Sequence, residues 1–187
     1  MRQNLPRAVR VYEAFHMIQR FNHNLSQLRR ELYSQSKDKT ERWMLKGLQW
    51  LLLKNPENLN EENGEKARLE EALRFNQPLA TAYYLKESLR EQFWHGRDYA
   101  EAARFLDSWL AEAKASGIRL IVGMALTVER HREGLLNYYR YPISTGPLEG
   151  TNNKIKTLKR QAYGYRDPEF FRLKILALQH SKYALVG

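Results

Sequence analysis

The chain has 187 residues, of which 43% are hydrophobic and 28% are charged, and it contains no cysteine. This length and composition predict a soluble globular domain or part of a larger one, and no apolar stretch approaches the length of a membrane span. Disulfides, thiolate catalysis and cysteine zinc sites are excluded, and the scattered histidines do not show the spacing of metal ligands. The first ten residues are basic but precede no continuous apolar run, so we expect no secretory signal and a cytoplasmic protein.

The charge of the chain favours a polyanionic partner such as nucleic acid, because the formal net charge is +10. Residues 151–187 hold eight lysines and arginines against Asp167 and Glu169, a net charge of +6, which leaves +4 for the first 150 residues. The basic surface is therefore concentrated near the C-terminus.

The run Val9–Tyr12 is β-branched and aromatic and could end a strand, but it stands alone in the sequence. One strand cannot satisfy its own hydrogen bonds. Either this run is not a strand, or the chain is the C-terminal portion of a protein whose sheet lies upstream.

The residues after this run are predicted to be helical. Apolar residues at spacings of three and four predict helices over about 14–33 and 39–54, the second ended by Asn55-Pro56. Asn60 is expected to cap a short charged helix, Pro78 to open another, and Asp98 to cap one that stops at Gly117. Four aromatic residues at helical spacings are expected in the core rather than as base-stacking platforms: Trp43, Trp94, Phe105 and Trp109.

A further helix is expected over 118–139, followed by the longest interval with a loop composition. Pro147 suits a first helical turn, Glu149 would lie in that turn, and Gly164 would end the helix. Asp167 is then expected to cap a last helix over about 170–183.

Two stretches carry motifs, at residues 11–31 and 144–166. The first contains Tyr12-Glu13-Ala14-Phe15-His16 and then Leu28-Arg29-Arg30. The second contains Gly146-Pro147-Leu148-Glu149-Gly150-Thr151-Asn152-Asn153-Lys154-Ile155-Lys156, then Lys159-Arg160 and Gly164-Tyr165. Together they resemble the C-terminal half of the DDE transposases of bacterial insertion sequences, specifically the ISL-three family.

The resemblance implies a ribonuclease-H-like fold with a long helical insertion between the second and third acids, which accounts for one strand followed by helices. We therefore expect a mainly α chain with at most one short N-terminal strand. Residues 1–187 would form a single partial transposase domain, in which 9–33 carry the second acid, 34–140 the helical insertion and 141–187 the third acid and the C-terminal helix.

The same resemblance implies a site for Mg²⁺ or Mn²⁺, in which converging carboxylates hold the metal ions that assist phosphodiester cleavage. Glu149 would be the third catalytic, metal-binding acid and Glu13 the second. The residues expected to bind the DNA backbone are Lys154, Lys156, Lys159 and Arg160. Asn152 and Asn153 would cap or kink the helix, or reach a phosphate or a metal-bound water.

Each of these residues also has a purely structural interpretation. Glu149 could stabilise the helix dipole, and Glu13 could cap the first long helix. His16 could be a hydrogen-bonded packing residue, and the Lys and Arg series from 154 to 160 could be an ordinary solvated face. The unbalanced sign of that series favours DNA contact.

Two features depart from the family's pattern. The first aspartate and its strands have no counterpart here, and Glu13 stands where the family usually has aspartate. These departures indicate a truncated, split or decayed transposase. We expect it in the bacterial cytoplasm, associated with the nucleoid. Its expected partners are the DNA of insertion-sequence ends and targets, and either a second copy of itself or the missing N-terminal half. The alternative is a non-catalytic, transposase-derived helical DNA-binding or regulatory protein.

Overall fold

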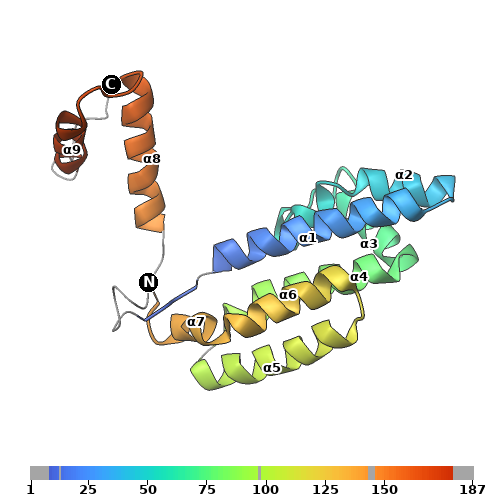
Figure 1. The fold of residues 1–187 in the computed structure, drawn as a ribbon. Coiled ribbons are helices and arrows are strands. Elements are labelled where there is room, and N and C mark those ends of the chain that lie inside the picture. The colour runs from blue at the N-terminus through green and yellow to red at the C-terminus, as the bar shows by residue number, and fades with distance from the viewer. Residues whose placement is uncertain (1–8, 13, 97, 143–145, 179–187) are drawn as a thin grey trace. The chain divides into compact units, whose positions relative to one another are not determined.

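The computed structural model of the chain describes residues 9–12, 14–96, 98–142 and 146–178. These residues are mainly helical and include no strand, which confirms the mainly α class (Figure 1). They belong to two compact units, Met1–Ile143 and Ser144–Gly187. No helix in the described ranges is long and apolar enough to cross a membrane.

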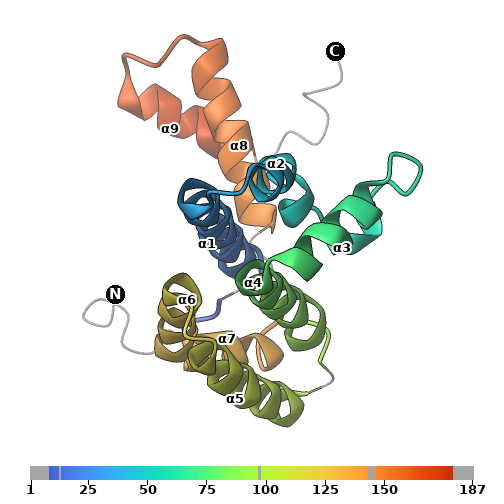
Figure 2. The same ribbon diagram turned by 90° about the vertical axis from the view of Figure 1, so that its right-hand side faces the viewer.

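The first unit is a bundle arranged around its longest helix, α1 (Ala14–Gln35). The apolar residues of α1 recur at spacings of three and four, and Phe21 and Leu25 are completely buried. Helix α1 contacts α2, α4 and α6, and α5 packs on α6 (Figures 1 and 2). The other elements of this unit are α2 (Lys39–Gly47), η1 (Leu51–Leu53), η2 (Pro56–Asn58), α3 (Glu65–Phe75), α4 (Gln77–Ser88), the π-helical turn η3 (Leu89–Phe93), α5 (Tyr99–Ala115), α6 (Arg119–Arg130), α7 (Arg132–Leu136) and η4 (Asn137–Tyr139).

Several helix ends confirm the expected signals. Asp98 accepts a hydrogen bond from the Glu101 amide at 2.8 Å and caps α5, whose end is followed by Gly117 with a φ of 64°. Pro78 lies in the first turn of α4, where Asn76 is the cap. Asn60 does not cap α3 as predicted: its side chain accepts from the Asn63 amide in a turn, and α3 begins after this turn, at Glu65.

The helix predicted over 39–54 ends at Gly47 and gives way to a turn and the 3-10 helix η1. Glycine weakens a helix interior, and the change of geometry allows the adjacent Leu51 and Leu52 both to be buried. The Leu52 carbonyl accepts a hydrogen bond from Lys86 Nζ at 2.9 Å. Burial lowers the pKa of Lys86, and its contact with Glu87 opposes that shift.

The aromatic residues expected in the core divide into two groups. Trp109 is buried and donates its indole N–H to the Leu85 carbonyl at 2.9 Å, and Trp94 and Phe105 are half-buried against the core. The prediction was wrong for Trp43, whose side chain is 73% exposed. Leu45 takes the buried side of α2, and two residues rotate a helix by about 200°, so Trp43 faces outward.

Residues 9–12 are not a strand but an extended segment that lies on α7. The Tyr12 amide donates to the Gly134 carbonyl at 2.9 Å, and the Asn137 side chain donates to the Arg10 carbonyl at 3.1 Å. The Tyr12 ring covers Gly134 so closely that a Cβ there would lie 2.4 Å from Tyr12 Cδ2. The Tyr12 N–H and the Arg10 carbonyl are thus bonded to α7 and to the Asn137 side chain instead of to a neighbouring strand.

The second unit contains α8 (Gly146–Gln161) and α9 (Pro168–Ala177). Gly164, with a φ of 100°, follows α8 as predicted. Asp167 accepts from the Glu169 and Phe170 amides at 2.9 and 3.2 Å and caps α9. Tyr165 stacks on Phe171 with ring centroids 4.7 Å apart, and so holds the turn between the helices against α9.

We predict that Trp109→Ala lowers the free energy of unfolding by about 3–5 kcal/mol, because it opens a cavity and removes the bond to Leu85. Trp43→Ala should change it by no more than about 0.5 kcal/mol, as at other exposed positions. Urea unfolding followed by far-UV circular dichroism measures both values. Equal losses would contradict the outward placement of Trp43.

We predict that Gly134→Ala destabilises the chain by about 1–3 kcal/mol, because the new methyl group must displace the Tyr12 ring. The matched control is Gly123→Ala in α6, where a Cβ meets nothing within 4 Å. That change should stabilise the chain by up to about 1 kcal/mol, since alanine favours a helix. Thermal unfolding of the two variants should shift in opposite directions, and a shift in the same direction would argue against the docking of Tyr12.

Candidate functional site

Glu149 lies in the first turn of α8 and is exposed. A carboxylate at this position is favoured by the helix dipole, and its oxygens are hard donors that suit Mg²⁺ or Mn²⁺. The other predicted metal-binding acid, Glu13, lies outside the described residues. Within the described ranges, no three Asp, Glu or His side chains gather as a metal site would require. These ranges therefore offer one carboxylate of the predicted set.

Helix α8 separates polar and apolar side chains onto opposite sides. Ile155 and Leu158 are half-buried, whereas the polar residues around them are exposed. A helix turns by about 100° per residue, which places four later residues within about 60° of Glu149 around the axis. We call this set, with Glu149, the α8 stripe: Glu149, Asn152, Asn153, Lys156 and Arg160.

The four predicted DNA-binding cations do not share one side of α8. Lys156 and Arg160 belong to the α8 stripe, and Lys159 lies about 80° from Glu149 on its flank. Lys154 is about 140° away from Glu149 and faces a different direction. The structure therefore joins three of the four cations into one surface and leaves Lys154 apart.

A shallow hollow of about 610 Å³ lies at the C-terminal end of α8. Its lining residues are Lys156, Lys159, Arg160, Tyr163 and Gly164, with no acidic residue among them. Tyr163 was not singled out from the sequence, because an aromatic residue after a helix is more commonly part of a packed turn. Its exposure could be found only from the fold.

A second polar hollow lies along α1 in the first unit. Its lining contains no acidic residue and consists of His16, Gln19, Arg20, His23, Asn24 and Gln27. His16 is exposed, and its ring centroid lies 5.4 Å from that of Phe15 in an edge-to-face contact at the surface of α1. The polar residues that line this hollow recur at spacings of three and four, so the sequence could have predicted that they share one side of α1. The prediction of this helix rested on its apolar residues alone.

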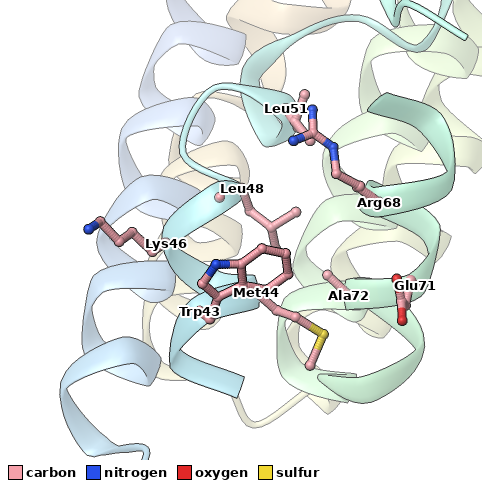
Figure 3. A pocket seen from close by; sticks show the side chains of 9 residues that line it. Trp43, Met44, Lys46, Leu48, Leu51, Arg68, Glu71 and Ala72 are labelled. Carbon is pink, nitrogen blue, oxygen red and sulfur yellow. The ribbon is translucent and has the colours of Figure 1, made fainter. Parts of the chain in front are cut away.

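An apolar pocket of about 380 Å³ lies between α2 and α3. Figure 3 shows the Trp43 indole beside Met44 and Leu48, with the Arg68 and Lys46 side chains at the margins. Its lining is suited to an apolar group and not to a metal ion. Trp43 is therefore a pocket wall rather than a core residue.

A family model described as a transposase matches residues 1–175. The transposase for insertion sequence element IS1001 of Bordetella parapertussis is 37% identical over 174 residues, which are 92% of this chain and 42% of that protein. The transposase for IS1557 of Mycobacterium tuberculosis is 35% identical over 144 residues, or 76% of this chain and 32% of that protein. No solved structure matches the chain.

The chain thus spans less than half the length of these two relatives. The family match nevertheless covers both motif stretches and all the helices between them. The chain belongs to the ISL-three family of transposases.

Proposed function

We propose that this chain is the C-terminal part of a transposase catalytic domain and that it acts in metal-dependent cleavage and strand transfer of DNA. The observation that supports this most directly is the α8 stripe, which begins with an exposed carboxylate and continues with amide and cationic side chains. Membership of a transposase family supports the interpretation of this carboxylate as a metal-binding acid and of these cations as DNA-binding residues. DNA at insertion-sequence ends and targets would be the partner, in the bacterial cytoplasm at the nucleoid.

In this proposal Glu149 and Glu13 would hold Mg²⁺ or Mn²⁺, together with an aspartate from outside these residues. The metal supplies activation of the attacking oxygen and stabilisation of the leaving oxygen. Glu149 is exposed, so an ion can reach its carboxylate, and oxygen donors of this kind fit Mg²⁺ or Mn²⁺. Residues 9–33, 34–140 and 141–187 would carry the second acid, the helical insertion and the third acid of one partial domain.

The cations of the α8 stripe would hold the DNA backbone close to Glu149. Lys156 and Arg160 lie two and three turns beyond Glu149, or about 10 and 16 Å at the rise of an α-helix. Successive phosphates along one DNA strand could be contacted over this length. Asn152 and Asn153 lie between the carboxylate and the first cation, where their amides can donate to phosphate oxygens.

We predict that Glu149→Gln abolishes the response of the DNA-bound chain to metal. The change keeps the size of the side chain and removes its charge, so Mn²⁺ binding measured by electron paramagnetic resonance should weaken at least tenfold, and any Mg²⁺-dependent nicking should disappear. Duplex affinity measured in EDTA should not fall, because a negative charge has been removed.

The control for this experiment is Glu169→Gln, which removes another exposed first-turn acid of the same unit. It should leave Mn²⁺ binding and nicking unchanged. If Glu149→Gln also leaves both unchanged while DNA is still bound, Glu149 serves only its helix, and the non-catalytic DNA-binding alternative is correct.

We predict that Lys156→Ala and Arg160→Ala each weaken binding to a duplex several-fold and reduce the slope of log affinity against log salt by about 1. Lys154→Ala removes the same charge from the same helix but from another side, so it should change affinity less than twofold. Fluorescence anisotropy over a salt series measures all three. Equal losses would show that net charge alone attracts the DNA.

A further inference from the structure

The Tyr163 ring has no packing role in the second unit. Its side chain is 100% exposed, and its backbone has a φ of 50°, in the left-handed region that aromatic residues rarely adopt. Asparagine or glycine would fit this position without strain. This left-handed residue closes the end of α8: the Tyr163 amide donates to the Arg160 carbonyl at 3.1 Å, and the Gly164 amide donates to the Lys159 carbonyl at 3.0 Å. Capping accounts for the backbone, and the full exposure of the ring is the feature that the fold leaves unexplained.

Tyr165, two residues further on, shows what a structural tyrosine does in the same turn. Its ring is half-buried and lies 4.7 Å from Phe171 at an interplanar angle of 23°. The turn is therefore already fixed by one aromatic contact. The Tyr163 ring is left available for a flat ligand.

The surroundings of Tyr163 define the chemistry of that ligand. Lys156, Lys159 and Arg160 line the same hollow, in which no acidic side chain takes part. Three cations suit a phosphate, and an exposed ring suits the face of a base. The neighbouring Gly164 has no side chain, so nothing at that position covers the hollow from this side.

We propose that the hollow at the end of α8 binds an unpaired DNA nucleotide, with its base stacked on Tyr163 and its phosphates held by Lys156, Lys159 and Arg160. In a duplex each base is already stacked between its neighbours, so the ring can reach a base face only where a strand is single or a base is turned out. The site deepens the proposed function, on which it rests, because it specifies the form of DNA that the basic helix prefers.

The test compares a single-stranded oligonucleotide with a duplex of equal length, both containing 2-aminopurine, which loses fluorescence on stacking. The variant is Tyr163→Asn, because asparagine accepts the left-handed backbone and deletes the ring. It should melt at the same or a higher temperature than the unmodified chain, so a failure to fold will not imitate a loss of binding.

We expect Tyr163→Asn to weaken single-strand binding roughly five- to hundredfold, the range for loss of one stacked base, and to abolish the quenching of 2-aminopurine. Duplex binding should change less than twofold. Tyr163→Phe should retain both properties. Tyr84→Ala, which removes another exposed tyrosine in the first unit, should change neither.

Unchanged single-strand binding and quenching in Tyr163→Asn would overturn the nucleotide site, as would an equal loss for the duplex. In either case duplex binding by the unmodified chain would still support the proposed function. An unmodified chain that binds neither form of DNA would instead contradict the proposed function itself.

Discussion

Burial of one face of α1 is the constraint on which the first unit depends. Phe21 and Leu25 are completely buried, and the helix that carries them contacts α2, α4 and α6. Removing this apolar face from water stabilises the folded state, and because the face packs against several helices at once, it holds them together. The same burial fixes the rotation of α1, so His16, Arg20 and His23 must face outward as a polar hollow. The packing of α1 thus determines both which of its residues form the core and which form the polar surface.

In helix α8, too, the apolar residues determine which way the polar residues face, although much less of its surface is buried. Its half-buried residues, Ile155 and Leu158, occupy one side, and the α8 stripe occupies the other. Because a helix is rigid between its ends, fixing two apolar residues fixes the direction of every charged one. Lys154 is separated from the other cations for this reason alone. The net charge of α8 therefore overstates the number of cations that lie on one side of the helix.

Local signals in the sequence predicted most of the fold. Helix periodicity, the cap at Asp98 and the glycine at 117 depend on neighbouring residues only, and all three were confirmed. The exposure of Trp43 depends instead on tertiary contacts, because Leu45 takes the buried side of its helix. The family was predicted from the resemblance of the two motif stretches, whereas the α8 stripe was not, because Lys154 was grouped with the other three cations. The exposure of Tyr163 was not, because a left-handed tyrosine and a packed one look alike in sequence.

Glu149 and Glu169 show why position in a helix does not by itself assign a function. Both are exposed acids in a first turn, and the helix dipole stabilises each of them equally well. Glu169 lies 3.5 Å from Arg172 on its own helix, an exposed pair of the kind that contributes little beyond local helix stability. Glu149 instead heads a row of amides and cations that extends for three turns along one side of α8. Under the proposed function, Glu149 differs from Glu169 not in its place in a first turn but in the amide and cationic side chains that the rest of α8 presents on the same side.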